Sequence, residues 1–501
     1  MSETTLTAAT FPSAPRPRPD PRLTLLACCF SLFMAQLDAT AVNVALPSIG
    51  TDLGAGISGL QWVVDGYVLV LACLAMTGGG LGDRYGRRRV YRIGLATFSL
   101  ASLGCSLMPT IVGLVGFRMV QAIGAAMLMP VTLSIVSNTF HEPVARARAI
   151  GIWAAAAGVA AGVGPIVGGA LASGLGWRAI FWINLPIGAL ALLLTGRYVP
   201  ESRAAEPRRP DLIGQAVLAV TLATLTYALI EAPRWGWGST TTLTILAGAA
   251  IGMLCFAVVE SRVGQPMIEP RYLRDRRFAG AGGIAVLTHL AVMGFLFLNS
   301  LYLQQVRDMS PLAAGAALLP VSLALAAVSP LAGRLTGRYG PRPVLVFASA
   351  CLIAGLAILA RTTPSTALML LATAYVLIGA GWGLLNPPLT NVAVDTMPRD
   401  QAGVASAAVG TSRQLGAVLG VAVMGSLTIT LTRAKLRYGP TDPSRLVAPG
   451  SGHGFGGAVG TAFTDATHMG YAVGIAAALA ALVLAIATLN DSRLVPHDGS
   501  G

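Results

Sequence analysis

The amino-acid sequence predicts an all-α integral membrane protein. We expect fourteen transmembrane helices, which form two pseudo-symmetric six-helix bundles with two further helices inserted between them. Three observations predict this class. Of the 501 residues, 54% are hydrophobic and 11% are charged, against roughly 25% charged in ordinary soluble domains. Long apolar runs alternate with short breaks, and one loop motif occurs twice. This composition excludes a water-soluble enzyme, which needs a polar surface, and a disordered chain, which contains few hydrophobic residues.

Fourteen apolar runs follow one another along the chain, each close to or above the ~20 residues that a helix needs to cross a bilayer. Because lipid offers the backbone no hydrogen bonds, each run is expected to be a helix. In order, the runs are 23–46, 60–81, 90–108, 110–137, 148–172, 177–199, 211–231, 239–260, 277–303, 311–335, 342–361, 365–391, 402–432 and 467–489.

These runs divide the chain into five parts. They are a disordered tail at 1–22, a first bundle at 23–199, the inserted helices with their linkers at 200–276, a second bundle at 277–489 that includes a loop at 433–466, and a tail at 490–501.

The basic residues set the expected orientation. The net charge is +13, and all 34 basic residues are arginine except Lys435. Most of the arginines fall in the two tails and in the loops on the same side as the N-terminus, which the positive-inside rule assigns to the cytoplasm. We therefore expect both termini in the cytoplasm and a multi-pass protein of the plasma (inner) membrane. This collar of arginines explains the positive charge without a nucleic-acid partner.

Several kinds of chemistry have no motif in the sequence. There is no Gly-Lys dipeptide, so the phosphate-binding loop GxxxxGK[ST] is absent. The six cysteines lie in apolar stretches and form no CxxC pair, which favours neither a disulfide framework nor a metal site. We expect no catalytic residues, no metal and no cofactor.

An internal repeat relates the two halves of the chain. The tripeptide Arg84-Tyr85-Gly86 recurs as Arg338-Tyr339-Gly340, each at the end of an even-numbered run, and residues 124–130 are echoed at 381–387. A repeat that returns eight helices later within fourteen implies six helices, two inserted helices and six more. Parallel six-helix repeats are typical of transporters whose binding site lies between the repeats.

Four motifs resemble those of the major facilitator superfamily and, within it, the branch of 14-helix drug:proton antiporters. They are the loop Gly79–Arg89, the segment Leu37–Pro47, Arg118 with Gln121 and Gly124, and Gly164-Pro165 with Gly168-Gly169, which resembles the motif that marks the exporters of the superfamily. The segment Gln61–Tyr67 also resembles antibiotic-resistance exporters of the methylenomycin-resistance type. The resemblance implies an exporter.

Three charged residues lie inside the apolar runs at similar depth: Asp38, Asp65 and Arg118. A buried charge costs about 2.5–3.5 kcal/mol on insertion scales, so we expect all three to face the interior and pair. Arginine keeps its proton, so a carboxyl group must carry the proton. We expect Asp38 to titrate, Arg118 to tune it, and Asp65 to act as a second acid or as a contact for a cationic substrate. The alternative is a permanent ion pair that only locks helices together.

The loop after the second run carries Asp83, Arg84, Gly86 and Arg87. The resemblance implies that Asp83 docks against the start of a helix of the second bundle, near Arg399, as a latch that holds the outward-open state. An acid at a helix N-terminus gains about 0.3–1 kcal/mol. The second copy of the motif has Gly337 in place of the aspartate, so this latch has no symmetric counterpart.

The fifth run carries Gly164, Pro165, Gly168 and Gly169. Small residues allow two helices to approach closely, and a proline frees a backbone carbonyl and kinks its helix. Plain packing and a gating bend both fit this pattern.

Two further polar residues lie within the later runs. Arg413 is an intramembrane arginine, and such residues are functional by default. The sequence gives it no evident partner, and Glu231 is the only guess. His289 is either a proton relay or a hydrogen-bonded packing residue.

We expect a proton-coupled exporter, an antiporter, of a small amphipathic drug or antibiotic. It would work by alternating access as a monomer in the lipid bilayer, driven by the proton gradient. The alternative is a proton-coupled symporter for a nutrient or metabolite, against which the exporter motif argues. A distant alternative is a polytopic membrane enzyme. A membrane prenyltransferase would need an aspartate-rich pair for a magnesium diphosphate, and the sequence has neither DD nor DxD.

Overall fold

The computed structural model describes residues 20–203, 211–263, 270–397, 402–436 and 457–489. Within these residues the chain forms helices and turns but no strand, and 14 helices are long and apolar enough to cross a membrane. The prediction of an all-α membrane protein with fourteen spans is therefore confirmed. Most of the predicted tails and the middle of the predicted loop 433–466 lie outside the described residues.

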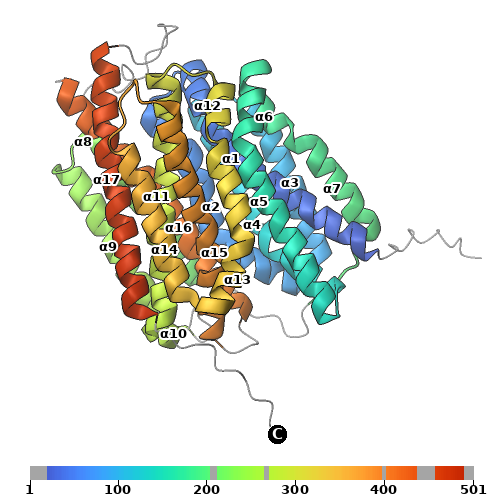
Figure 1. Cartoon of the computed structure of the whole chain (residues 1–501). Coiled ribbons are helices and arrows are strands. Elements are labelled where there is room, and N and C mark those ends of the chain that lie inside the picture. Colours follow the sequence, from blue (N-terminus) through green and yellow to red (C-terminus); the bar gives the residue numbers. More distant parts are fainter. Residues whose placement is uncertain (1–19, 204–210, 264–269, 398–401, 437–456, 490–501) are drawn as a thin grey trace, which may run out of the picture.

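The first bundle lies on the right of Figure 1. Its helices are α1 (Pro21–Leu53), α2 (Ile57–Tyr85), α3 (Arg87–Leu107), α4 (Ile111–Thr139), α5 (Pro143–Gly174), α6 (Ala179–Trp182) and α7 (Asn184–Tyr198). The predicted span 177–199 is thus divided between α6 and α7. The break follows from Pro186, which has no N–H to donate to the carbonyl of Trp182 four residues earlier.

The second bundle lies on the left of Figure 1. Its helices are α11 (Arg276–Leu301), which a π-helical turn extends over Tyr302–Val306, α12 (Pro311–Ala317), α13 (Leu319–Tyr339), α14 (Pro341–Leu359), α15 (Leu368–Asp395), α16 (Ala402–Leu436) and α17 (Gly457–Thr488). The predicted span 311–335 is divided at Leu318. The cause is the same as in the first bundle, because Pro320 cannot donate to the carbonyl of Ala316.

Both helices that flank the predicted loop 433–466 extend into it, which corrects the sequence prediction. α16 continues to Leu436, and α17 begins at Gly457. Ala462 and Phe463 in this stretch are buried, with 7% and 1% exposure. The small, glycine-rich sequence has weak helix propensity, and burial against the second bundle stabilises the first turns of α17 instead.

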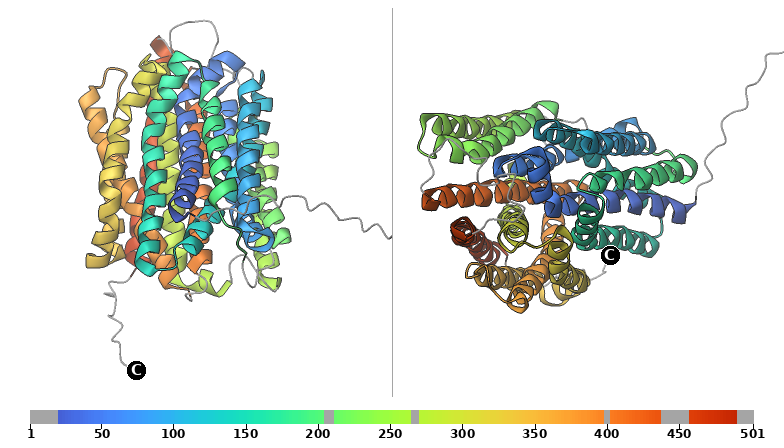
Figure 2. Two further views of the ribbon diagram at one scale, coloured as in Figure 1. Left: turned by 90° about the vertical axis from the view of Figure 1, so that its right-hand side faces the viewer. Right: turned by 90° about the horizontal axis from the view of Figure 1, so that it is seen from above.

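The inserted helices form a pair at the margin of the molecule, drawn in green in Figure 2. They are α8 (Leu212–Trp235) and α9 (Thr240–Arg262), followed by the short helix α10 (Pro270–Arg274). α8 also packs against α2 and α16. Near the start of α8, Nε2 of Gln215 donates to the carbonyl of Cys73 on α2 at 2.6 Å. Near its end, the carbonyl of Pro233 accepts from Nη1 of Arg433 on α16 at 2.7 Å. α8 is therefore bonded to one bundle at its start and to the other at its end.

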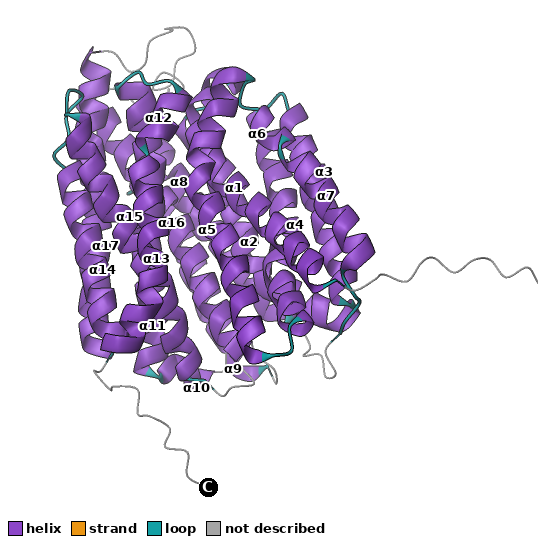
Figure 3. Cartoon of the chain, turned by 45° about the vertical axis from the view of Figure 1, so that its right-hand side comes forward, coloured by secondary structure: helices purple, strands orange, loops and turns teal. Residues whose placement is uncertain are grey.

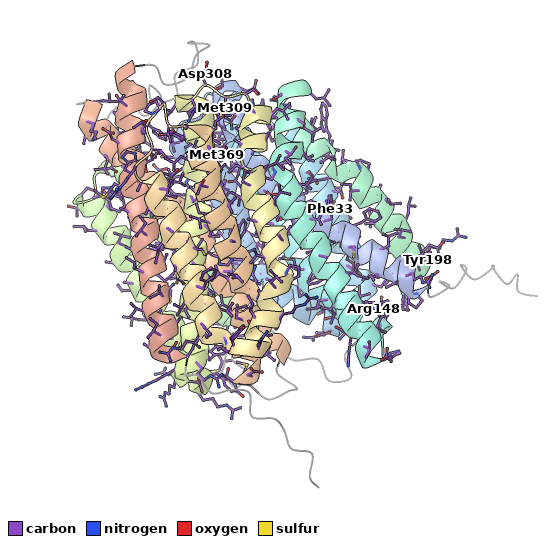
Figure 4. The ribbon with its side chains drawn as sticks, viewed as in Figure 1. Phe33, Arg148, Tyr198, Asp308, Met309 and Met369 are labelled. Atoms are coloured by element: carbon purple, nitrogen blue, oxygen red, sulfur yellow. The ribbon has the colours of Figure 1, made fainter. Side chains whose placement is uncertain are left out.

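The helices run side by side between two ends of the molecule (Figure 3). We call the end at which α1 begins and α17 ends the arginine-rich end, since most of the arginines lie in its loops, and we call the other the opposite end. Figure 4 shows Arg148 and Tyr198 towards the first of these and Asp308 and Met309 at the second. Four helices that begin at the arginine-rich end are capped by an acidic side chain that accepts first-turn N–H groups: Asp20 on α1, Glu142 on α5, Asp211 on α8 and Asp275 on α11.

Candidate functional site

A polar cluster lies inside the first bundle between α1, α4 and α7. Asp38 comes from α1, Arg118 and Gln121 lie one turn apart on α4, and Asn184 is the first residue of α7. None of the four is more than 2% exposed. Residues three apart share one face of a helix, which aims both α4 side chains at Asp38. The break before α7 places Asn184 in the interior at a helix start.

Every other member of this cluster donates a hydrogen bond to the carboxylate of Asp38. Nη1 of Arg118 donates to Oδ2 of Asp38 in a buried ion pair. Oδ1 accepts from Nε2 of Gln121 at 3.0 Å and from Nδ2 of Asn184 at 2.9 Å. A buried ion pair is stable only when its remaining polar atoms are also hydrogen-bonded, and the two amides meet this need for Asp38. The predicted pairing of Asp38 with Arg118 is confirmed, and its part in proton coupling stays a prediction.

The sequence prediction missed the part of three residues in this cluster: Asn184, Ser102 and Tyr67. Asn184 also donates to Oγ of Ser102 at 2.9 Å. The guanidinium carbon of Arg118 lies 4.2 Å from the ring centroid of Tyr67 on α2, a distance suited to a cation–π interaction. The sequence carried one signal for Asn184, because an isolated amide within an apolar span must find a partner inside the protein.

Asp65 stands apart from the cluster. It lies on α2 with 0% exposure, and in the described residues neither of its carboxyl oxygens has a hydrogen-bond partner. Arg118 instead uses its Nε to donate to the carbonyl of Val63 at 3.3 Å. The expected pairing of Asp65 with a neighbouring charge is therefore not observed within the described residues. Of the two buried aspartates, Asp38 has partners and Asp65 has none among these residues.

The glycines of the exporter motif face α1 on one side of α5. A Cβ on Gly164 would collide with the side chain of Thr40, and one on Gly168 would collide with the backbone of Ala41. Only glycine permits this approach between α1 and α5. These two positions thus serve close packing within the first bundle.

The other side of α5 meets the second bundle. A Cβ on Gly169 would lie 2.9 Å from Cα of Leu312 on α12, and a Cβ on Gly315 would lie 2.9 Å from the carbonyl carbon of Pro165. Both distances are too short for a real Cβ. The exporter segment therefore also forms part of the contact between the bundles.

Side chains of α11 join the bundles near the opposite end. Pro47 of α1 has no N–H, so the carbonyl of Asn43 has no partner in its own helix. Oγ of Ser300 donates to this carbonyl at 2.6 Å, and Nε2 of Gln304 donates to the carbonyl of Val44 at 2.7 Å. We call these two hydrogen bonds the α1–α11 contact. The first of its acceptors exists because of the proline in α1.

A second junction joins α2 to α16. Nε2 of Gln61, which is fully buried, donates to the carbonyl of Val421 at 2.8 Å. Beside the α1–α11 contact lies a cavity of about 20 Å³, lined among others by Thr40, Pro165 and Trp382. A space of this size suits one water molecule rather than a drug. The bundles are thus closely packed around these junctions.

We expect Ser300→Ala combined with Gln304→Leu to loosen this closure. The carbonyl of Asn43, left unsatisfied, costs about 1–3 kcal/mol, and the loss of the second hydrogen bond adds to this, so the closed arrangement should lose roughly 5–150-fold or more in population. A cysteine introduced at Thr40 reports the change, as its reaction rate with a membrane-impermeant maleimide should rise when the reagent is added from the side of the opposite end. The parent chain supplies the background from native cysteines.

The matched control for this variant is Ser329→Ala. The hydroxyl of Ser329 bonds to the carbonyl of Leu325 in its own helix. Equal labelling of the control and the double variant would contradict a closing role for the α1–α11 contact.

An ion pair spans the short connection between α2 and α3. Oδ1 of Asp83 lies 2.7 Å from Nη2 of Arg87, four residues later, while Arg84 is exposed. Gly86 has a φ of 107°, in the region that favours glycine. The expected partner near Arg399 lies outside the described residues, so the latch stays a prediction.

Arg413 bonds to a neutral partner. Its Nη1 donates to Oδ1 of Asn386 on α15 at 2.8 Å. The guess that Glu231 pairs with it is wrong, since an oxygen of Glu231 lies 4.0 Å from Nη1 of Arg234. One ring nitrogen of His289 lies 3.1 Å from a backbone carbonyl of its own helix, a contact that fits the packing interpretation. In the part of the chain that the structure describes, no three His, Cys, Asp or Glu side chains form a metal-binding group.

The fold and the polar cluster define a class of protein. Two six-helix bundles that meet through close glycine contacts, with buried charges inside the spans, make a multi-pass membrane transporter rather than an enzyme. A family model described as the Major Facilitator Superfamily matches residues 28–421. The chain belongs to this family, and the resemblance inferred from the sequence motifs is confirmed.

Several known proteins are similar to this chain along most of its length. The multidrug resistance protein Stp of Mycobacterium tuberculosis (strain ATCC 25618 / H37Rv) is 42% identical over 415 residues, which cover 83% of this chain and 77% of that protein. The methylenomycin A resistance protein of Streptomyces coelicolor is 38% identical, with 81% and 84% covered. A puromycin resistance protein of Streptomyces alboniger is 34% identical, with 99% and 97% covered.

Solved structures share the fold at low sequence identity. A bacterial homolog of the human lysosomal transporter Spinster superposes with a TM-score of 0.65 at 19% identity, covering 95% of this chain and 99% of that one. A mutant of the nucleoside transporter NupG superposes with a TM-score of 0.63 at 12% identity, covering 92% and 99%.

Proposed function

We propose that the protein is a proton-coupled antiporter that exports a small amphipathic drug or antibiotic by alternating access. Two observations support this function. The relatives named above are resistance proteins, and the glycine-proline segment of α5 lies where the bundles meet. Following the positive-inside rule, the arginine-rich end faces the cytoplasm of the cell membrane. The transporter needs no cofactor beyond the proton gradient and works as a monomer.

The conformation is the one that accepts cargo from the cytoplasm. The hydrogen bonds of Ser300, Gln304 and Gln61 join the bundles towards the opposite end, which is the outer side in this proposal. Export then requires these junctions to part while the cytoplasmic side closes. In each junction a neutral side chain donates a hydrogen bond to a backbone carbonyl. Such a bond can break without leaving an unpaired charge.

The observation that carries proton coupling is the contrast between Asp38 and Asp65. The carboxyl group of Asp38 accepts hydrogen bonds from a guanidinium and two amides. Asp65 is fully buried without a partner among the described residues, and burying such a group is far less costly as the neutral acid than as the anion. Asp65 therefore holds a proton in this conformation. In the proposed cycle, a movement that parts Arg118 from Asp38 removes the counter-charge of this carboxylate and so favours its protonation.

The experiment is drug uptake into inverted membrane vesicles with an acidic lumen. An antiporter accumulates the drug and, at the same time, raises the luminal pH reported by a trapped pH dye. A symporter would instead carry preloaded drug out of the lumen together with protons. Drug uptake that leaves the luminal pH unchanged would refute proton antiport.

Asp65→Asn tests the assignment within the same assay. Asparagine resembles the neutral acid in shape and charge, so the variant should insert and bind drug but move few protons per drug. Asp465→Asn is the control, because Asp465 forms an exposed ion pair with Lys435. Proton movement equal to wild type in Asp65→Asn would exclude Asp65 as a proton carrier. A loss confined to cationic drugs would assign Asp65 to substrate contact instead.

A further inference from the structure

The first bundle has an open groove at the arginine-rich end, on the flank that faces away from the second bundle. The groove has a volume of about 760 Å³ and is bordered by α3, α7 and the residues that follow α7. α3 and α7 pack on each other on the side of the molecule away from the second bundle (Figure 1). The groove therefore lies away from the transport path between the bundles.

One of the groove's charges is already satisfied by the protein. The carboxylate of Glu201 accepts from the backbone N–H groups of Arg88 at 3.0 Å and Arg89 at 3.2 Å, which lie in the first turn of α3. Nη2 of Arg88 donates to the carbonyl of Gly196 on α7 at 2.5 Å. Glu201 thus occupies the N-terminus of α3, where an external anion would otherwise bind.

Two other charges in the groove have no counter-charge. Arg89 and Arg92 are both exposed, and their side chains make no hydrogen bond or ion pair with the rest of the described chain. They lie one turn apart on α3, so both guanidinium groups project from the same face. Two adjacent arginines that pair with no acid of the described chain make a site for an anion.

The wall below these arginines is apolar. Ile93, Ala96 and Leu192 line the same groove, and Ile93 is 48% exposed. The exposed face continues along α3 through Leu100 to Leu107, which lies about 27 Å from Arg89 at 1.5 Å per residue. This distance is close to the thickness of a hydrocarbon core, about 30 Å, so the groove runs from the headgroup layer into the lipid.

We propose that the groove binds an anionic glycerophospholipid of the leaflet at the arginine-rich end. The phosphate lies between the guanidinium groups of Arg89 and Arg92, whose planar N–H groups suit phosphate oxygens. An acyl chain lies along Ile93, Ala96 and Leu192. The order of charge and apolar surface in the groove matches that of a lipid, whereas a soluble phosphate ester would leave the apolar wall uncovered.

The test measures lipid binding to the full-length purified protein by native mass spectrometry. Phosphatidylglycerol and phosphatidylcholine of equal acyl chains are compared, with soluble glycerophosphoglycerol as a third ligand. We expect phosphatidylglycerol to bind in preference to phosphatidylcholine, and Arg89→Gln with Arg92→Gln to weaken its binding roughly 30-fold, since each basic residue near an anionic headgroup contributes about fivefold. The assay uses neither drug nor pH gradient, so it is independent of the transport function.

Arg146→Gln with Arg148→Gln is the matched control. These arginines are also exposed at the arginine-rich end, on α5 and outside the groove, and their loss should leave binding unchanged. Arg92→Gln alone provides a milder variant if the double variant does not fold. Ile93→Ser should weaken the lipid but not the soluble headgroup.

Three results would overturn the proposal. They are equal binding of the two lipids by the wild type, equal loss in the control and groove variants, and binding of glycerophosphoglycerol as tight as that of phosphatidylglycerol. The last of these would identify a site for a free phosphate ester.

Discussion

Asp38→Asn should abolish gradient-driven drug uptake in inverted vesicles while the protein still reaches the membrane. The asparagine keeps the shape of the side chain but leaves Arg118 as a buried guanidinium without an anion. Removing one partner of a buried pair costs about 3–5 kcal/mol, so conformations that bury Arg118 lose more than ~100-fold in population. The position also loses its only titratable group. The measurement is the initial uptake rate per amount of protein in the membrane.

Asp52→Asn is the control for this substitution. Asp52 also lies on α1 and pairs with an arginine, Arg178, but the side chain is 47% exposed, and exposed pairs contribute about 0–1 kcal/mol. Uptake by this variant should stay near the wild-type rate.

A double variant, Asp38→Asn with Arg118→Gln, separates folding from coupling. It removes the unpaired buried charge, so the amount of protein in the membrane should recover, but gradient-driven uptake should not. Full uptake by Asp38→Asn alone would show that the ion pair only holds α1 and α4 together.

Gly169→Val should slow turnover by a different route. Its Cβ would meet the backbone of α12 at Pro311 and Leu312, and backbone cannot swing away as a side chain can. Overpacking of this kind costs about 1–3 kcal/mol, which would shift the balance away from the closed contact by roughly 5–150-fold. We expect drug binding to persist and the export rate to fall by that factor.

The matched control is Gly158→Val on the same helix, where a Cβ would meet nothing within 4 Å. Both substitutions place the same β-branched residue in α5, so any loss of helix propensity is shared. A wild-type export rate in Gly169→Val would mean that the contact between α5 and α12 does not take part in the cycle.

The sequence predicted the spans well because hydrophobic length is a local property. Each apolar run became a membrane-crossing span, two of them with a break, and the Asp38–Arg118 pair followed from the high cost of leaving a charge unpaired in a membrane. The helix breaks before Asn184 and at Leu318 were not predicted, although Pro186 and Pro320 cause them. A proline within an apolar run is also compatible with a kinked but continuous helix, and the neighbours decide between the two.

The rest of the site depends on contacts between distant helices. Nothing near Asp65 in the sequence distinguishes it from Asp38, since both are lone acids in apolar runs. Asp38 has partners only because α4 and α7 bring Arg118 and Asn184 beside it. The sequence likewise did not predict that the Asn43 carbonyl accepts a hydrogen bond from another helix, because this requires both Pro47 and a hydroxyl from α11. Such pairings are tertiary properties that local patterns do not contain.

The two-ended attachment of α8 limits how the transporter can move. A helix of 24 residues is a rod of about 36 Å, and here one end is pinned to α2 and the other to α16. A rigid helix that is hydrogen-bonded to one bundle at each end fixes the distance between these two contacts but still allows the bundles to rotate about them. While both hydrogen bonds hold, we expect the bundles to change access by rocking about this side of the molecule instead of drawing apart.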